Sequence, residues 1–349
     1  MTRRAAIILA GGKGERFQTD PGKWQDKSLA PLFGSPLLVR AVENVKAIVD
    51  EVVVCVNEEK RKENYSEVLR AHEIANVRLL VDERFDSLGG PLVAIFTGLK
   101  HLNADYCLTL PGDMPLVQPK VIEYMFERAK GTYVVVPVWP NGRLETLSMV
   151  LERETSLQIA ETLCMLLRPR SDDIIRGTSN VDFVSTIGEI SLIDPELKSF
   201  VNINSPQDLT KLQPRRVEGM VTKNLHVKRG SLPTVEMKQL RNAAVLFQKR
   251  EFLEASEAFS NCAAAFKKKG VLFWTAVSRE NEGKSLLRLS ESKPRLGDDQ
   301  ASRSKLAFLD AASAYGLEAE EHEKCRCYFL ADRARSDKSW CEKRSQSLN

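Results

Sequence analysis

An apolar run that stops at a glycine pair constrains this sequence more than any other feature. Residues Ile7 to Ala10 are followed by Gly11 and Gly12, and Gly14 comes two residues later. An apolar run without alternation is typical of a buried strand in a parallel sheet. Glycines after such a strand let the backbone approach a ligand closely and adopt positive φ. The sequence therefore predicts a strand that ends in a ligand-binding loop.

Phosphate is the ligand that this loop favours. Lys13 and Arg16 lie in it, so basic side chains can neutralise phosphate oxygens while backbone N–H groups point at them. The loop is not a dinucleotide fingerprint, because Phe17 stands where the third glycine belongs. The later Gly22-Lys23 pair is followed by Trp24, so it is not a Walker A loop. A plain connection between strand and helix is an equally good interpretation of this loop taken alone.

Strands alternate with helices over the following part of the chain. β-Branched and apolar segments predict further strands at 51–57, 77–82, 105–115 and 132–137, and helical spacing predicts helices at 35–45, 60–71 and 88–95. This alternation is typical of βαβ units, whose strands form a mainly parallel sheet with helices on both faces. We therefore predict a three-layer, doubly wound α/β fold.

Polar residues follow the predicted strands at equivalent places. Gly12, Asn57, Asp82 and Asp113 each stand just past the end of an apolar strand, and in this architecture those ends share one crevice. Asn and Asp also cap helices and form turns, but four such positions together favour a polar site. Asp113 is well placed to bind Mg²⁺, which prefers one or two carboxylates together with water and substrate phosphates.

A second polar cluster lies near residue 200. Apolar and polar residues alternate from Phe200 to Asn204, and Ser205-Pro206 then predicts the start of a helix. Asn202 and Asn204 would therefore project from one face of a short strand. Their amide oxygens suit a metal ion or a hydrogen bond to a ligand, and solvation of an edge strand is the alternative.

Four sets of residues resemble, in order and spacing, the motifs of the MobA-like nucleotidyltransferases, and within them the molybdenum cofactor guanylyltransferases. They are Leu9–Gly12 with Arg16 and Asp26–Leu32, then Gly89–Leu92, Gly112–Pro115 and Asn202–Leu209. The resemblance covers about residues 4–213. It implies a Mg²⁺-dependent enzyme that transfers GMP from GTP to the phosphate of molybdopterin and releases pyrophosphate.

The resemblance also implies roles for individual residues. The catalytic residues would be Lys27, Arg16 and Asp113, with Asp113 holding the metal and Asn202 and Asn204 near the metal and the acceptor phosphate. A carboxylate at Asp82 suits guanine, because it can accept hydrogen bonds from both N1–H and the N2 amine. The full set of nucleotide-binding positions would be Leu9, Ala10, Gly11, Gly12, Lys13, Gly14, Lys27, Asn57, Asp82, Gly90, Pro91 and Asp113.

The chain departs from the family pattern at three places. The stretch between Arg16 and Lys27 is longer than usual, Gly112 stands where Cys is frequent, and Thr146 stands where Pro is common. Because the third departure bears on the acceptor, a different phosphorylated acceptor is an alternative: adenosylcobinamide phosphate, 2-phospholactate or a sugar phosphate, with GTP or CTP as donor. A nucleotide-binding scaffold that acts through its C-terminal helices is another, and the retained Lys27 and Asp113 argue against it.

The sequence pattern changes after residue 213. Residues 1–213 carry 25 Lys and Arg against 29 Asp and Glu (net −4), and residues 214–349 carry 26 against 18 (net +8). Both signs are interspersed there and aromatic residues are not, which disfavours nucleic acid as a partner. Apolar residues at helical spacing begin at Val235, and the pattern of Phe259–Phe266 recurs 49 residues later as Phe308–Tyr315. This resembles tetratricopeptide-type repeats, whose period is usually 34 residues; a single helical bundle is the alternative.

We therefore predict four segments. They are a nucleotidyltransferase domain at 1–213, a linker at 214–234, an α-helical repeat-like domain at 235–335 and a disordered polar tail at 336–349. The helical domain would bind a protein partner or another copy of the chain. No apolar run approaches the length of a membrane span. Seven scattered cysteines without a CxxC pair favour a reduced, cytoplasmic protein without structural zinc.

Overall fold

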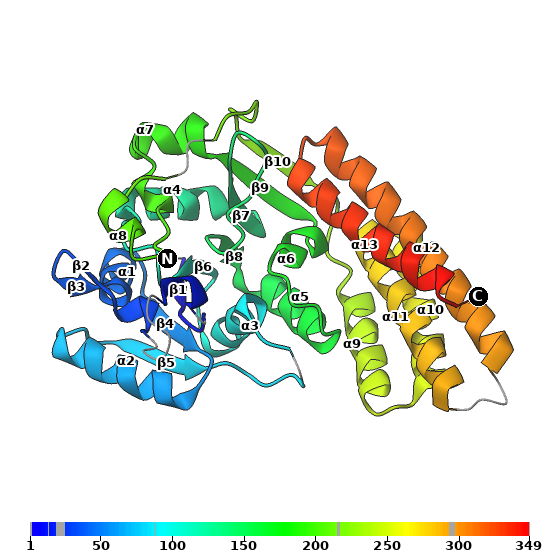
Figure 1. Cartoon of the computed structure of the whole chain (residues 1–349). Coiled ribbons are helices and arrows are strands. Elements are labelled where there is room, and N and C mark those ends of the chain that lie inside the picture. The colour runs from blue at the N-terminus through cyan, green and yellow to red at the C-terminus, as the bar shows by residue number, and fades with distance from the viewer. Residues whose placement is uncertain are drawn as a thin grey trace. The chain divides into compact units, whose positions relative to one another are not determined.

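The chain forms two compact units, Met1–Gly230 and Ser231–Asn349, and each is described by itself (Figure 1). The computed structural model describes residues 2–12, 14–18, 25–86, 88–214, 217–292 and 297–348, without the side chains of residues 297 and 298. The nucleotide-binding prediction for Lys13 lies outside the described residues. So does most of the longer stretch that precedes Lys27.

A mainly parallel sheet forms the centre of the first unit, as predicted. In the described part of the chain it has eight strands in the order β10-β9-β7-β8-β6-β1-β4-β5. β1 pairs in parallel with both β4 and β6, whereas β8 and β10 run antiparallel to their neighbours. The strands are β1 (Arg4–Leu9), β4 (Glu51–Val56), β5 (Val77–Val81), β6 (Tyr106–Pro111), β7 (Val134–Val138), β8 (Val150–Glu152), β9 (Asn180–Ser185) and β10 (Leu225–Lys228).

Helices cover both faces of this sheet (Figure 1). Ile8 and Val54 belong to a core shared with α1, α2 and α4. On the opposite face α3 lies so close to β1 that a Cβ at Gly98 would come within 2.6 Å of the Ile7 side chain. Burial on both faces explains why the central strands have no polar alternation. The helices are α1 (Leu37–Lys46), α2 (Glu59–Ala71), α3 (Pro91–His101), α4 (Pro119–Ala129), α5 (Arg153–Met165), α6 (Asp172–Gly177), α7 (Ser191–Ile193) and α8 (Asp208–Lys211), and β2 (Pro31–Leu32) and β3 (Ser35–Pro36) form a small hairpin.

The predicted linker at 214–234 was wrong in its first part. Residues Leu225–Lys228 form β10, which pairs with β9 through Val227 and Val181, so the first unit extends to Gly230. β10 lies at the edge of the sheet, and its side chains are alternately half-buried and exposed. Because an edge strand needs few apolar residues, its sequence resembles that of a loop.

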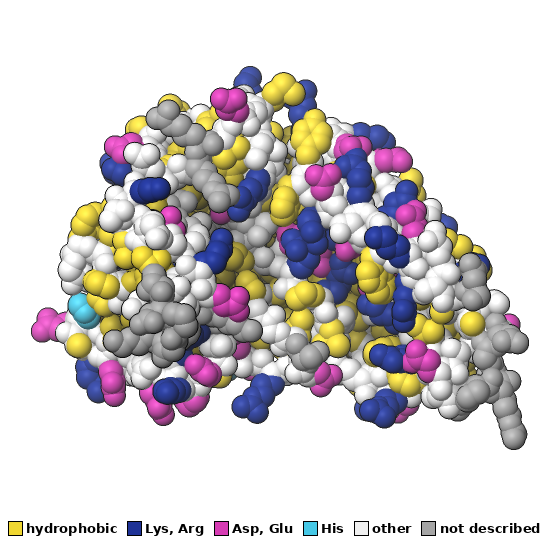
Figure 2. Space-filling model, viewed as in Figure 1, with side chains coloured by type: hydrophobic (Ala, Val, Ile, Leu, Met, Phe, Trp, Pro, Cys, Tyr) yellow, Lys and Arg dark blue, Asp and Glu magenta, His cyan; other side chains and the backbone are white. Residues whose placement is uncertain are grey.

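The second unit is all-helical in its described residues. Consecutive helices pack against one another, and the four aromatic residues at the 49-residue offset, Phe259, Phe266, Phe308 and Tyr315, are fully buried. On the face seen in Figure 2, Lys and Arg side chains of this unit are interspersed with Asp and Glu. Among the described residues, no helix has both the length and the apolar composition that crossing a bilayer requires. The helices are α9 (Thr234–Gln248), α10 (Phe252–Lys268), α11 (Leu272–Ser292), α12 (Gly297–Lys324) and α13 (Tyr328–Gln346).

The predicted disordered tail at 336–349 was also wrong over most of its length, because α13 continues to Gln346. Cys341 is fully buried, and the Trp340 ring packs edge-on against Phe308 with 5.8 Å between centroids. The Trp340 contact and the burial of Cys341 show that this largely polar helix packs into the unit, where α13 lies against α12. The polar composition of the segment conceals them.

Candidate active site

A cavity of about 620 Å³ lies at the carboxyl ends of the central strands. It collects predicted site residues from segments that are far apart in the sequence. Gly14 is not among the residues that line it. The predicted residues that do are Leu9, Ala10, Gly11, Gly12, Arg16, Lys27, Asn57, Asp82, Gly90, Pro91, Asp113, Asn202 and Asn204. The structure thus brings these residues together, and the roles assigned to them stay predictions.

Two positions in the loop after β1 require glycine, Gly11 for lack of space and Gly14 for its positive φ. A Cβ at Gly11 would lie 3.2 Å from the Asn57 backbone nitrogen and 3.5 Å from Asp82 Oδ2, so this position has almost no room for a side chain. Gly14 has a φ of +61° and begins the short 3₁₀ helix Glu15–Phe17, a conformation that favours glycine. Gly14 therefore shapes the loop, and the following turn carries Arg16 to the cavity wall.

A buried network behind the loop was missed in the sequence. Arg61 of α2 is only 4% exposed; its Nε lies 3.2 Å from Asp26 Oδ2, and its Nη1 donates to Asn57 Oδ1 at 2.8 Å. The Tyr65 hydroxyl, one turn later, donates to Asp26 Oδ1 at 2.9 Å. Asp26 in turn accepts from the Ser28 amide at 3.0 Å and caps the short helix that begins at Lys27. The network therefore positions a predicted phosphate ligand and a predicted nucleoside ligand together.

The contact with Arg61 also fixes which end of the Asn57 side chain a ligand meets. A guanidinium only donates hydrogen bonds, so the amide oxygen of Asn57 must face it. Asn57 itself is exposed at the cavity. Its NH₂ group is therefore the end that is available to a ligand, as a donor.

Asp82 is a half-buried carboxylate. Its Oδ1 is buried and has no hydrogen-bond partner among the described residues, although the side chain lines the cavity. Burial raises the pKa of Asp82 to about 7. A buried, unpartnered carboxylate oxygen is costly unless a ligand supplies the hydrogen bond. Asp82 is therefore suited to accept from ligand N–H groups.

Asp113 lies at the end of β6 and forms an ion pair with Lys27 through Oδ2. Its Oδ1 is buried and has no hydrogen-bond partner among the described residues. That oxygen fits a Mg²⁺ ion. The described residues contain no group of three or more His, Cys, Asp or Glu side chains that could hold a metal by themselves. A cation at Asp113 would therefore complete its shell with water and substrate phosphates, as Mg²⁺ usually does.

The segment that carries Asn202 and Asn204 is extended but is not the predicted strand. Its single sheet-like bond runs from the Ile203 amide to the Asp113 carbonyl oxygen at 3.0 Å, which is too little pairing for a ladder. Val201 and Ile203 are buried while the two asparagines are half-buried and line the cavity, so the predicted shared face is confirmed. Asn204 Oδ1 accepts from Arg16 Nη2 at 3.4 Å.

The connection between β7 and β8 forms another wall, of which only Thr146 was linked to the acceptor from the sequence. Glu145 faces the cavity, and its Oε1 accepts from the Trp139 indole N–H at 2.6 Å. Burial raises the pKa of Glu145, and the Trp139 hydrogen bond acts in the opposite direction. The sequence signal was a carboxylate beside the noted Thr146, within a glycine-containing turn. The lining residues of this wall are Arg143, Leu144, Glu145, Thr146 and Leu147.

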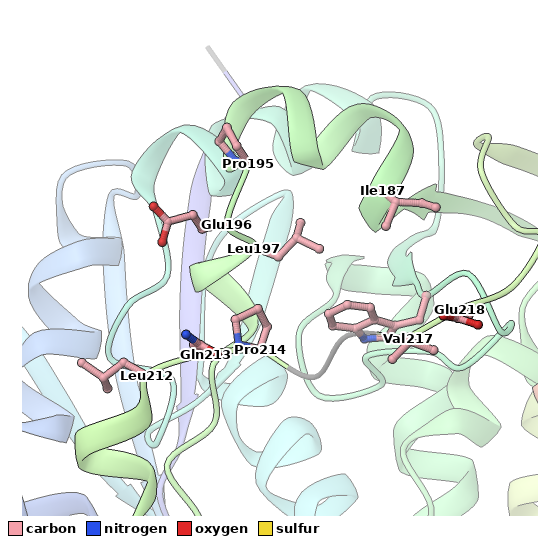
Figure 3. A pocket seen from close by; sticks show the side chains of 10 residues that line it. Ile187, Pro195, Glu196, Leu197, Leu212, Gln213, Pro214, Val217 and Glu218 are labelled. Atoms are coloured by element: carbon pink, nitrogen blue, oxygen red, sulfur yellow. The ribbon is translucent and has the colours of Figure 1, made fainter.

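Trp139 also lines a second cavity of about 500 Å³. Figure 3 shows Ile187, Leu197 and Pro214 around it, from three different segments of the first unit. The two cavities share no lining residue among those described. Trp139 is thus connected to both, by its ring on one side and by the Glu145 hydrogen bond on the other.

Known proteins resemble this chain over its first part. The MobA-like NTP transferase domain matches residues 6–176. A probable molybdenum cofactor guanylyltransferase of Methanosarcina acetivorans is 34% identical over 214 residues, which are 60% of this chain and 89% of that protein. Another, from Thermococcus kodakarensis, is 32% identical over 60% of this chain and 94% of its own length.

A solved structure is also similar. Molybdopterin-guanine dinucleotide biosynthesis protein A from Archaeoglobus fulgidus is 23% identical, covers 60% of this chain and 96% of its own, and has a TM-score of 0.48. The family match and the 34% identity across nearly all of a relative carry the assignment. This chain belongs to the MobA-like NTP transferase family and is a nucleotidyltransferase.

Proposed function

We propose that the enzyme transfers GMP from GTP to the phosphate of molybdopterin and releases pyrophosphate, with Mg²⁺ held at Asp113. The observation that carries the proposal is the pair of side chains beside Gly11. Asp82 offers a buried acceptor oxygen, and Asn57 offers a donor. The relatives named as molybdenum cofactor guanylyltransferases support the choice of acceptor.

Guanine suits this pair of residues. Its N1–H and N2 amine are adjacent donors that one carboxylate can accept together, and its O6 is an acceptor for the Asn57 amide. Adenine, cytosine and uracil lack two adjacent ring-edge donors. They would leave Asp82 incompletely paired, and an unpaired buried polar group is the strongest source of discrimination between similar ligands. GTP is therefore the proposed donor, and CTP is the alternative.

The transfer itself needs positioning and charge neutralisation. An oxygen of the acceptor phosphate attacks the α-phosphorus of GTP, the bond to the β-phosphate breaks, and pyrophosphate leaves with its electron pair. A phosphomonoester is already largely ionised at neutral pH, so no strong general base is required. No histidine is found among the described residues that line the cavity.

The residues of the chain divide this work. Lys27, Arg16 and the amides of the glycine loop would neutralise the triphosphate, and Arg16 with Asn204 would also contact the acceptor phosphate. Mg²⁺, when bound, would supply further positive charge at the reacting phosphates. In the proposed reaction Asp113 anchors that charge at the end of β6, beside Lys27.

The test is pyrophosphate release by the full chain with each of the four nucleoside triphosphates, with and without molybdopterin, in Mg²⁺ or in EDTA. We expect release only with GTP, molybdopterin and Mg²⁺ together. Pyrophosphate release with adenosylcobinamide phosphate, 2-phospholactate or a sugar phosphate, but not with molybdopterin, would identify that compound as the acceptor instead. Binding of GTP without transfer to any of them would favour a nucleotide-binding scaffold.

The described residues that line the cavity all belong to the first unit, so no role in the chemistry is assigned to the helical unit. We retain as predictions that it is a tetratricopeptide-type array, that it binds a protein partner or a second copy of the chain, and that the enzyme acts in the cytoplasm. The oligomeric state of the full chain in solution tests self-association directly.

A further inference from the structure

Besides Asp82 and Asp113 the cavity is lined by a third carboxylate, Glu145, which lies away from the nucleoside side. Asp82 follows the edge strand β5, whereas Glu145 lies in the connection from β7 to β8, where its amide donates to the Pro137 carbonyl oxygen at 3.0 Å. Strands β4, β1 and β6 stand between these two positions. The glycine loop and Asp113 follow β1 and β6. A ligand that reaches Glu145 therefore lies on the opposite side of the phosphates from the nucleoside.

Trp139 holds Glu145 in place. The indole is 5% exposed, donates to Glu145 Oε1 at 2.6 Å, and packs edge-on against Phe200 with 5.7 Å between ring centroids. Phe200 immediately precedes the segment that carries Asn202. One buried aromatic residue therefore contacts both Glu145 and the residue that leads into the Asn202 segment.

Two kinds of recognition meet in this cavity. Arg16 and Asn204, which contact each other, suit an anionic phosphate. Glu145 suits the opposite chemistry, because a partly buried carboxylate accepts hydrogen bonds and repels another carboxylate. A molecule that satisfies both has a phosphate at one end and hydrogen-bond donors in its body.

We propose that Glu145 determines acceptor specificity, by accepting hydrogen bonds from N–H or O–H groups in the body of the acceptor, and that Trp139 is its positioning residue. The class of acceptor is then a phosphomonoester with adjacent donors, such as those of an aminopyrimidinone ring, and without a carboxylate. This inference rests on the proposed function, since it assumes that an acceptor phosphate reacts with GTP. It separates molybdopterin from the acidic alternative, 2-phospholactate.

Binding free energies favour acceptors with hydrogen-bond donors over acceptors with a carboxylate. A donor-bearing acceptor gives Glu145 a charge-assisted hydrogen bond, and such bonds are worth about 1.5–3 kcal/mol. That range corresponds to a change of roughly 10- to 100-fold in affinity. A carboxylate-bearing acceptor would instead bring a second negative charge toward Glu145, a repulsion that Arg143 on the same wall offsets only in part.

Binding is the readout that tests this, because it does not require turnover. The affinities of molybdopterin and of 2-phospholactate are measured by titration calorimetry on the full chain loaded with Mg²⁺ and the non-reacting analogue α,β-methylene-GTP. Wild type, Glu145→Gln and Trp139→Phe are compared. Glu145→Gln keeps the size of the side chain, and its melting temperature and its affinity for the analogue serve as folding controls.

We expect wild type to bind molybdopterin at least ~10-fold more tightly than 2-phospholactate. Glu145→Gln should lower the affinity for molybdopterin by roughly 10- to 100-fold and raise the affinity for 2-phospholactate, while the affinity for the GTP analogue stays unchanged. Trp139→Phe removes the indole donor; in separate turnover assays with GTP it should raise the KM for the acceptor more than it lowers kcat. Equal binding of the two acceptors by wild type, or unchanged affinities in Glu145→Gln, would overturn the inference.

Transfer assays with GTP on the same variants, set beside the titrations, separate this inference from the proposed function. Transfer to molybdopterin that is insensitive to Glu145→Gln would leave the function standing and remove the role of Glu145. The opposite result is a wild type that fails to bind molybdopterin but binds mannose 1-phosphate, with weaker binding of mannose 1-phosphate in Glu145→Gln. That result would keep the role of Glu145 and exclude molybdopterin as the acceptor. Mannose 1-phosphate has hydroxyl donors and no carboxylate, so it belongs to the class that Glu145 should accept.

Discussion

The guanidinium of Arg61 donates to the side-chain oxygen of Asn57 at 2.8 Å, and Arg61 Nε lies 3.2 Å from Asp26 Oδ2. Asn57 follows β4, and Asp26 immediately precedes Lys27. One buried cation therefore ties a residue on the nucleoside side to the segment that carries a predicted catalytic lysine. Arg61 contacts both from behind, on α2, without lining the cavity itself.

Arg61→Ala should therefore impair nucleotide binding from outside the cavity. The substitution frees the Asn57 amide to rotate and leaves Asp26 without its cation, a change that costs about 3 kcal/mol for buried pairs. We expect the affinity for GTP to fall by more than ~10-fold, together with a loss of stability. Titration with GTP and chemical unfolding measure the two effects.

The matched control is Arg70→Ala, because Arg70 lies on the same helix and is exposed. It should change neither quantity. An Arg61→Ala variant that keeps wild-type affinity for GTP would show that the network does not position Asn57.

Lys27→Ala and Asp113→Ala should each lose most of the turnover and remain folded. Each removes charge at the reacting phosphates, and single groups of this kind are worth roughly 10²- to 10³-fold in kcat. Lys100→Ala removes a largely exposed partner of Glu83 and serves as the control. Pyrophosphate release, with circular dichroism for folding, is the measurement. Near-normal turnover in either variant would exclude that residue from the mechanism.

Asp82 predicts a specific dependence on pH. The raised pKa of about 7 means that the folded protein binds a proton that the unfolded chain has already released between about pH 4 and pH 7. The contribution of Asp82 to stability is therefore greatest at low pH and is lost as pH rises through 7. Between pH 5 and pH 8 the melting temperature of Asp82→Asn should therefore decrease less than that of wild type. The same dependence of melting temperature on pH in the two proteins would contradict this.

GTP binding should respond to the same group with the opposite sign. The ionised carboxylate is the form that accepts from guanine, so the affinity of wild type for GTP should rise with pH through about 7. Asp82→Asn should bind GTP weakly at every pH and discriminate less against ATP. Calorimetric titrations at pH 6 and pH 8 decide the point; an Asp82→Asn variant with the pH dependence of wild type would assign it to another group.

Gly11→Ala should disturb the loop, whereas Gly12→Ala should leave its stability unchanged. An added Cβ at position 11 meets the Asn57 backbone at 3.2 Å, and at position 12 it meets nothing within 4 Å. Overpacking of this kind costs about 1–3 kcal/mol. The free energies of unfolding of the two variants make the comparison, and equal values would show that the Asn57 backbone gives way easily.

The sequence was sufficient for the parts of the molecule that depend on local pattern. The central strands are buried on both faces, so they are continuous apolar runs, and Asp82 and Asp113 could be placed because they follow such runs. Fold class and cavity both follow from these two facts. β10 could not be found in the same way, because an edge strand with half-buried side chains has almost no pattern.

The residues that were missed depend on tertiary contacts. Arg61 lies in a helix rich in Glu and Lys, where a charged residue is normally solvated, and only its contacts with Asp26 and Asn57 explain its burial. Glu145 lies in a turn, and its orientation depends on the indole of Trp139. Neither set of contacts produces a residue spacing that could be recognised in a single sequence.

The antiparallel insertion of β8 between β6 and β7 has a consequence for how this enzyme can diversify. It places the wall that carries Glu145 on one continuous hairpin, residues 139–149, while the nucleotide side is assembled from loops after several strands. On the proposed role of Glu145, replacement of that single hairpin would change which acceptor body is recognised and leave the nucleotide side intact. The part of acceptor preference that Glu145 contributes would then be transplantable, because it is encoded in about a dozen consecutive residues.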